Sequence, residues 1–187
     1  MASKMSNQAI LRSIAAVYGG GQNSVDQAMS DALEGLMREI GCTRISLWRF
    51  ERHTGSRGLR CFVAKLSGQP PVADSTLLRE EQYRDYYKAL VCGAVFVSND
   101  ALIDPRLLAM RAVYLKANKI SALLDIPVMI NGRAYGIVCC EQTDMPYRWS
   151  PAQVLAARES VTRAGLLLAR EPSIRLGEIE SMPIEPF

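Results

Sequence analysis

The stretch KISALLDIPVMINGRAYGIVCCEQ, residues 119–142, consists of two apolar runs joined by Asn131-Gly132. Asn-Gly is the strongest short signal for a hairpin, because both residues tolerate the positive φ that a two-residue type I′ turn requires. Both faces of the resulting hairpin are largely apolar. We therefore expect the hairpin at the centre of a sheet that helices cover on both sides.

The turn also predicts how the two strands pair. Counting back from Ile130 opposite Arg133 places Asp125 and Glu141 on opposite faces of the hairpin. A carboxylate in a covered strand needs a partner or a ligand. We expect Asp125 to face a ligand and Glu141, at the end of its strand, to pair with Arg148.

Other helices and strands flank the hairpin. Apolar residues at helical spacing predict helices at 6–18, 25–40, 76–90, 105–118 and 151–169. Runs of β-branched and aromatic residues predict strands at 43–50, 59–66 and 94–100. Asp104-Pro105 and Ser150-Pro151 each combine an N-cap residue with a proline at the first helical position, so they begin two of these helices.

The length of 187 residues fits one well-cored domain. We expect an N-terminal helix and hinge at 1–22, a folded domain at 23–170 and a tail at 171–187. Lysine and arginine (22) barely exceed the acids (19) and are scattered, so we expect no nucleic-acid partner. No stretch resembles a membrane span or a signal peptide, so we expect a soluble protein in the cytoplasm, without a membrane partner.

The cysteines indicate reduced thiols of the core. They are odd in number and lack the pairing of a zinc site; they are Cys42, Cys61, Cys92, Cys139 and Cys140. Cys61, Cys139 and Cys140 lie within apolar strands, where burial disfavours the reactive thiolate. We expect these three to be buried and without functional chemistry, and we predict no metal site.

The order helix, two strands, helix, strand, helix, hairpin, helix resembles a GAF domain. The similar strings are SLWRF (46–50), Tyr83 with Tyr87 and Leu90, NDALIDPR (99–106) with Tyr114 and Leu115, residues 120–128, residues 132–141, and Arg148 with Trp149. In this form they are similar to the branch found in bacterial sensor histidine kinases and diguanylate cyclases, over roughly residues 25–170. The resemblance implies an α+β fold, with helices on both faces of a central antiparallel sheet and a small molecule bound against one face.

The sequence departs from its relatives where they bind known groups. Residues 139–142 read Cys-Cys-Glu-Gln, where the branch commonly reads Cys-His-Glu-His. Alignment with the bilin-binding GAF domains of phytochromes places the chromophore Cys-His pair at Met110 and Arg111, so the resemblance predicts no covalent bilin there. Asn118-Lys119 is not followed by the rest of the cyclic-nucleotide motif. The ligand and any cofactor therefore remain unknown.

Within this resemblance, the hairpin would form the floor of a ligand pocket, and the helices at 76–90 and 105–118 would form its roof. Tyrosines recur along one stripe of the first roof helix, which suits either packing on the sheet or a pocket. We expect Asp125 to be the main ligand contact. The full set of candidate ligand-binding residues is Tyr83, Tyr87, Asp100, Met110, Asp125 and Glu141, and we predict no catalytic residue.

The leading hypothesis is a non-enzymatic small-molecule sensor that signals through a homodimer or a separate signalling protein. The dimer would form through residues 6–18 and 151–169, where small residues permit close helix approach; these are Ala156, Ala157, Ala164 and Gly165. One alternative is a dimerisation module without a ligand. Another is a free methionine sulfoxide reductase, for which Cys92, expected in a loop, is the best candidate nucleophile.

Overall fold

The hairpin forms the centre of the fold in the computed structural model, which describes residues 27–53, 56–92, 95–130, 132–169 and 182–183. Its strands, β6 (Ile120–Ile130) and β7 (Arg133–Thr143), pair antiparallel. The strand order is β3-β2-β1-β7-β6-β5, with β4 beside β2 and β8 beside β7. The other strands are β1 (Arg44–His53), β2 (Ser56–Leu66), β3 (Val72–Ala73), β4 (Leu77–Arg79), β5 (Phe96–Ser98) and β8 (Met182–Pro183).

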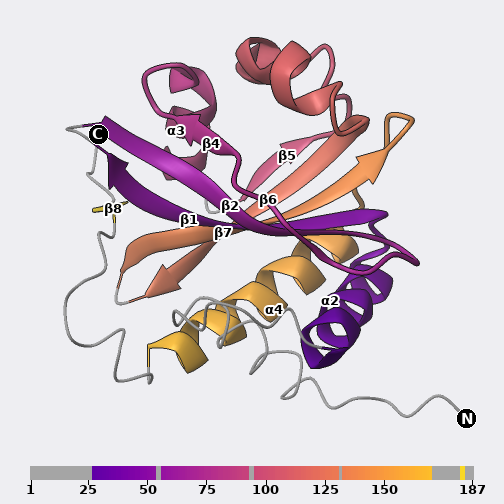
Figure 1. The fold of residues 1–187 in the computed structure, drawn as a ribbon. Coiled ribbons are helices and arrows are strands. Elements are labelled where there is room, and N and C mark those ends of the chain that lie inside the picture. Colours follow the sequence, from indigo (N-terminus) through magenta and orange to yellow (C-terminus); the bar gives the residue numbers. More distant parts are fainter. Residues whose placement is uncertain (1–26, 54–55, 93–94, 131, 170–181, 184–187) are drawn as a thin grey trace, which may run out of the picture.

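Helical segments cover both faces of this sheet (Figure 1). On one face lie α2 (Gln27–Ile40) and α4 (Pro151–Leu168). On the other lie α3 (Arg84–Cys92), the 3₁₀ turns of η1 (Pro105–Met110) and the π turn of η2 (Arg111–Leu115). The predicted α+β fold and the central place of the hairpin are confirmed. Among the helices that the structure describes, none is long and apolar enough to cross a membrane.

The two faces carry different cores. The face toward α2 and α4 is largely aliphatic, with Leu33, Ile40, Ile126 and Val138 among its buried residues. The face toward α3, η1 and η2 is rich in aromatic side chains. We call this second group the aromatic cluster; its buried aromatic members are Trp48, Phe50, Tyr86, Tyr87, Phe96 and Tyr114.

The last helix begins and packs for reasons visible in its sequence. Ser150 and Gln153 form the predicted capping box, with the Gln153 side chain accepting from Ser150 N (3.0 Å) and the Ser150 hydroxyl accepting from Gln153 N (3.2 Å). Farther along, a Cβ on Gly165 would lie 2.6 Å from the carbonyl oxygen of Met129. Gly165 therefore permits close approach of α4 to β6 within the chain.

The segment predicted as a helix over 76–90 is a helix only in its second half. Leu77–Arg79 instead form β4, which pairs with β2 from Gly58 to Arg60. A Cβ on Gly58 would lie 2.7 Å from Leu77 Cδ1, so the absence of a side chain lets β4 approach. A three-residue strand of this kind is fixed by a distant partner, and local periodicity does not reveal it.

The segment predicted as a helix over 105–118 covers the sheet with a different hydrogen-bond pattern. Asp104 is the expected N-cap, and its carboxylate accepts from Arg106 N at 3.0 Å. The chain then forms 3₁₀ turns followed by a π turn, in which Lys116 N donates to Arg111 O at 2.9 Å. The apolar spacing predicted the buried side correctly, although it did not predict the type of helix.

A β-bulge in the hairpin changes the predicted register. Met129 pairs with Ala134 as expected, but Val128 pairs with Gly136, which leaves Tyr135 as an extra residue in β7. Ala134 and Tyr135 are buried in opposite cores. The pairs from Val128–Gly136 to Ala122–Gln142 are therefore shifted by one residue from the prediction, and a second irregularity between Ile120 and Ala122 restores the predicted register at the last pair, Ile120 with Thr143.

This shift overturns the predicted placement of the two acids. Asp125 pairs with Cys139, so its side chain lies on the same face as Cys139. Glu141 follows Cys139 by two residues, and alternate residues of a strand share a face. Asp125 and Glu141 therefore lie on the same face of the sheet, toward the aromatic cluster.

Other predictions concern parts of the chain that lie outside the described residues. The helix expected at 6–18 is among these, as is most of the tail expected at 171–187. Within that tail, Met182 and Pro183 form β8 and pair with Ala134 and Arg133. The domain limits at residues 22 and 170 remain predictions.

Candidate functional site

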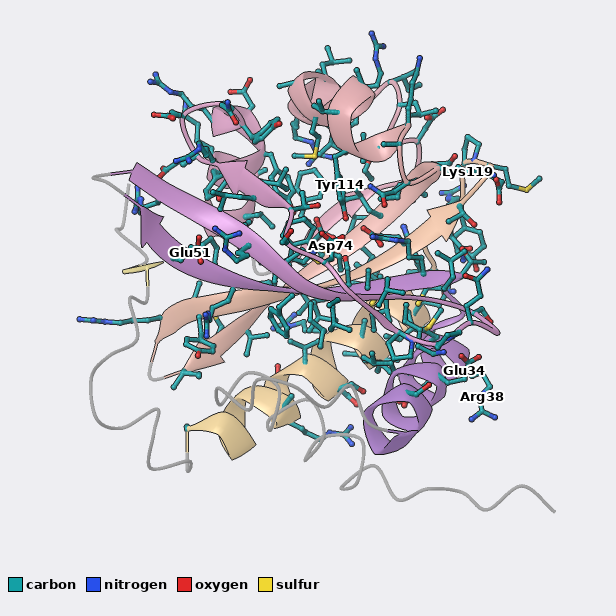
Figure 2. The ribbon with its side chains drawn as sticks, viewed as in Figure 1. Glu34, Arg38, Glu51, Asp74, Tyr114 and Lys119 are labelled. Carbon is teal, nitrogen blue, oxygen red and sulfur yellow. The ribbon has the colours of Figure 1, made fainter. Side chains whose placement is uncertain are left out.

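The aromatic cluster fills the space between the sheet and its cover of α3, η1 and η2. Tyr86 of α3 meets Phe96 of β5 edge to face, with ring centroids 5.3 Å apart. Trp48 of β1 meets Tyr114 of η2 in the same way at 5.4 Å. Figure 2 shows Tyr114 between the η segment and the sheet. The two carboxylates of the hairpin are buried among these rings.

Asp125 has an incomplete set of hydrogen bonds. Its side chain is 1% exposed, and its Oδ2 accepts from the Tyr86 hydroxyl at 2.7 Å. Its Oδ1 has no hydrogen-bond partner among the described residues. The Cys139 thiol lies beside the carboxyl and favours its charged form, but a thiol is only a weak donor. One oxygen of a buried carboxyl is therefore left without a strong donor.

Burial also changes the acidity of Asp125. Removal from water raises its pKa to about 7, and the Glu141 carboxylate adds to the effect. The hydrogen bond from Tyr86 and the contact with Cys139 oppose the shift without cancelling it. Asp125 consequently gains or loses its charge near neutral pH.

Glu141, in contrast, is surrounded by donors. It pairs with the Arg44 guanidinium of β1, and both side chains are at most 2% exposed. The Tyr114 hydroxyl donates to Glu141 Oε1 at 3.0 Å, and Arg44 Nη1 donates to the Tyr114 oxygen at 3.2 Å. Burial opposes the charge of Arg44, but Glu141 and Tyr114 together outweigh that effect and raise the pKa of Arg44.

The predicted pairing of Glu141 with Arg148 is wrong. Arg148 is exposed, whereas β1 pairs with β7 so that Arg44 lies directly opposite Glu141. The partner comes from the first strand of the sheet. That strand follows from long-range pairing, and the sequence near the hairpin contains no sign of it.

Three of the other predicted ligand residues lie in or against the aromatic cluster. Tyr83 is half-buried against it, while Tyr87 and Met110 are buried within it. The Tyr87 hydroxyl donates to the carbonyl oxygen of Leu78 at 2.7 Å, which ties α3 to β4. Asp100 is placed differently: its carboxylate accepts from Leu102 N at 3.2 Å and so holds the turn before η1.

Sequence reasoning missed the residues that contact the two acids. Tyr86, which binds Asp125, is on the same tyrosine stripe as Tyr83 and Tyr87 but was not selected. Arg44 and Tyr114, which bind Glu141, come from elements far away in the chain. The stripe could have indicated Tyr86, because a helix buries one side and Tyr86 and Tyr87 share it with Leu90.

Cys61, Cys139 and Cys140 are free and buried, as predicted, and so is Cys42. Burial raises the pKa of the Cys61 and Cys139 thiols, which lie in the aromatic cluster. On the opposite face, a hydrogen bond with Cys42, together with burial, raises the pKa of Cys140. Cys92 is the last residue of α3, contrary to the expected loop. No three metal-ligating side chains of the described residues come together.

A family model of the GAF domain matches residues 24–168. The chain belongs to the GAF family. The match supports neither the predicted branch of histidine kinases and diguanylate cyclases nor any other. A search of curated proteins finds no match.

Solved GAF structures share the fold of this domain. The blue-light absorbing form of the PixJ GAF domain of Thermosynechococcus elongatus superposes with a TM-score of 0.64 at 16% identity, over 87% of this chain and 88% of that one. The phycoerythrobilin-bound GAF domain of a cyanobacterial phytochrome gives 0.61 at 13%, over 92% and 97%. The chromophore-binding domain of Stigmatella aurantiaca bacteriophytochrome gives 0.58 at 13%, over 89% and 61%.

Proposed function

We propose that this GAF domain is a non-enzymatic small-molecule sensor of the cytoplasm, which binds its ligand between the sheet and the cover of α3, η1 and η2. The observation that carries the proposal is Asp125 Oδ1, a buried carboxyl oxygen to which no described residue supplies a strong donor. A buried polar group left unpaired costs about 1–3 kcal/mol. A ligand that donates a hydrogen bond to Asp125 would recover that free energy.

The cover over Asp125 is suited to moving. α3 has nine residues, and η1 and η2 consist of 3₁₀ and π turns, whose hydrogen-bond geometry is poorer than that of an α-helix. Elements of this kind open locally at lower free energy than the strands beneath them. Ligand binding would shift the domain from this closed state toward an open one.

The chemistry of the thiols supports a role without catalysis. A cysteine nucleophile acts as a thiolate, and burial raises the pKa of Cys61 and Cys139 on the ligand face. The similar GAF domain of a cyanobacterial phytochrome is bound to phycoerythrobilin, and a bilin attached through a thioether needs a free thiol. Met110, at the attachment position, has none. A bilin held without a covalent bond is one arm of the test below.

For signal output we propose a homodimer through the outer face of α4. Leu155 (56% exposed) and Leu166 (61% exposed) lie three turns apart on that face. These exposed leucines also suit the alternative function, a dimerisation module without a ligand. A separate signalling protein could bind the same surface of α4.

The test is a ligand screen on three forms of the protein. Freshly purified protein is examined by native mass spectrometry for a retained ligand. Thermal shift is then measured with a metabolite library that includes biliverdin, on wild type, Asp125→Asn and the exposed control Glu159→Gln. We expect a stabilising compound whose effect is kept in the control. Asp125→Asn should lose about 1.5–3 kcal/mol of its binding, the range for a hydrogen bond to a charged group.

Two outcomes contradict the proposal. Equal stabilisation of wild type and Asp125→Asn would remove Asp125 from the binding site. A screen without any retained or stabilising compound would favour the dimerisation module.

A further inference from the structure

The charges around Asp125 do not balance. Tyr86, Cys139 and Glu141 act directly on Asp125, and the other ionisable groups buried on that face are Tyr87 from α3, Cys61 from β2, Arg44 from β1 and Tyr114 from η2. The phenols and thiols among them are neutral, because burial raises their pKa. Glu141 and Arg44 cancel each other as a buried ion pair. An ionised Asp125 would therefore leave one uncompensated negative charge.

Arg106, which lies over Phe96, already has a counter-ion. The Arg106 guanidinium stacks over Phe96 with its carbon 4.2 Å from the ring centroid. It forms an ion pair with Asp104, with Nη2 and Oδ2 2.6 Å apart. β5 and η1 contribute uncharged side chains to the cluster, including Phe96, Leu107 and Met110. The protein thus supplies no spare cation for Asp125 among its described residues.

The aromatic rings around Asp125 also favour a positively charged ligand. Aromatic faces carry negative partial charge and attract ammonium and guanidinium groups, most strongly where water is excluded. Tyr86, Phe96 and Tyr114 are all buried around the two carboxylates. An anionic ligand would meet two acids and these rings, whereas a cation would meet a counter-ion and a favourable surface.

We infer that the ligand of this site is a compact organic cation, a protonated amine or an amidinium, whose N–H groups donate to Asp125. This inference rests on the proposed sensor function and names the ligand class of the same site. The ligand is compact because buried side chains occupy the cluster, so that only a small group can replace them without removing the whole cover.

Binding of a cation should change the protonation of Asp125. Asp125 is largely protonated at pH 6, since burial raises its pKa to about 7. A cation binds only the ionised carboxylate, so binding at pH 6 should release a proton. The apparent affinity should rise about tenfold per pH unit below 7 and level off by pH 8.

Two matched pairs of compounds test the class. Benzamidine is compared with the neutral benzamide, and benzylamine with benzyl alcohol, by calorimetric titration and thermal shift at pH 6, 7 and 8. We expect the cations alone to bind wild type, with proton release at pH 6 and tighter binding at pH 8. Asp125→Asn should lose at least tenfold in affinity and the pH dependence, while its amide oxygen can still accept from Tyr86.

A second variant, Tyr86→Phe, tests whether the loss of binding in Asp125→Asn reflects the charge of Asp125 and not a change of structure. Tyr86→Phe removes the donor that opposes the raised pKa of Asp125, so the loss of binding relative to wild type should be largest at pH 6 and smallest at pH 8. Equal binding of a cation and its neutral partner would overturn the cation class and leave the sensor function intact. The same holds if the library gives only neutral or anionic ligands that depend on Asp125. If nothing binds, both proposals fail.

Discussion

Asp125 and Glu141 lie on the same face of one hairpin, but the protein accommodates their charges differently. Glu141 pairs with Arg44 and accepts a hydrogen bond from Tyr114. Among the described residues, Asp125 has one good donor, Tyr86, and no cationic partner. A buried charge is tolerated only when it is paired, and a buried carboxyl without a pair shifts its pKa instead. Glu141 is therefore structural, whereas Asp125 keeps an oxygen without a strong donor and is the group that we propose as the ligand contact.

The structural role of Glu141 gives a stability prediction. Glu141→Gln leaves Arg44 buried without a counter-ion, so we expect the free energy of unfolding to fall by about 3–5 kcal/mol. The control is Glu159→Gln, which breaks an exposed i,i+4 pair with Arg163 and should cost about 0.3–0.5 kcal/mol. Urea denaturation measures both. Similar losses in the two variants would contradict the assignment.

At the scale of residues, the sequence indicated which groups are unusual but not their partners. Asp125 and Glu141 were recognisable as acids in an apolar strand. Arg44 was not recognisable as the partner of Glu141, since β1 reaches β7 only through the pairing of strands far apart in the chain. The positions of opposite charges in a sequence do not show which residues of two strands lie opposite each other. That register decides which charges form an ion pair.

At the scale of elements, one extra residue decided the geometry of the site. The turn signal predicted both strands of the hairpin and their first two pairs. The bulge at Tyr135 then moved Glu141 to the face of Asp125. Tyr135 and Ala134 both find buried positions in opposite cores because of the bulge, and this packing gain is invisible to a pattern with a strict period of two.

The helix α4 was predicted correctly, but most of the small residues that we assigned to its outer face lie elsewhere. Three of the four small residues that we expected at a dimer interface pack within the chain instead: Ala157 and Ala164 are fully buried, and Gly165 lies against Met129, whereas Ala156 is half-buried. The outer face keeps two exposed leucines, Leu155 and Leu166. Any partner of α4 within a dimer would therefore meet leucines.

This face gives a test of the proposed dimer. We expect wild type to be a dimer by light scattering at micromolar concentration, and Leu155→Glu/Leu166→Glu to be a monomer, because each glutamate would be buried without a partner. The control is Ile103→Glu/Val113→Glu, which changes exposed apolar residues beside the ligand cover and should remain dimeric. A monomeric wild type, or a dimer lost only in the control, would reject the α4 interface.

At the scale of the whole molecule, the sheet separates two unlike sides, which we call the anchoring side and, because we propose that it binds the ligand, the responsive side. Long helices and an aliphatic core cover the first face, and short turns over an aromatic core cover the second. The layers of helices and sheet could be predicted from the sequence, because apolar residues recur with one period in helices and with another in strands. The aromatic filling of the responsive side could not, since it combines rings from β1, α3, β5 and η2.

The acid buried on the responsive side should make the stability of the whole domain depend on pH. Asp125 has a raised pKa in the folded state, so the folded protein keeps its proton up to about pH 7 while the unfolded chain loses it near pH 4. Its contribution to stability is therefore largest below pH 4 and falls as pH rises to 7. Glu34 and Asp104 have lowered pKa values, so their contribution is lost only in more acidic solution and stays constant above pH 5.

Between pH 5 and pH 8 we accordingly expect wild type to lose about 3 kcal/mol of unfolding free energy through Asp125. Asp125→Asn cannot ionise, so its stability should change much less over the same range. Urea denaturation of both forms at pH 5, 6, 7 and 8 measures the difference. Parallel pH profiles would show that Asp125 is not the buried acid that titrates, and would remove the proton release expected on cation binding as well.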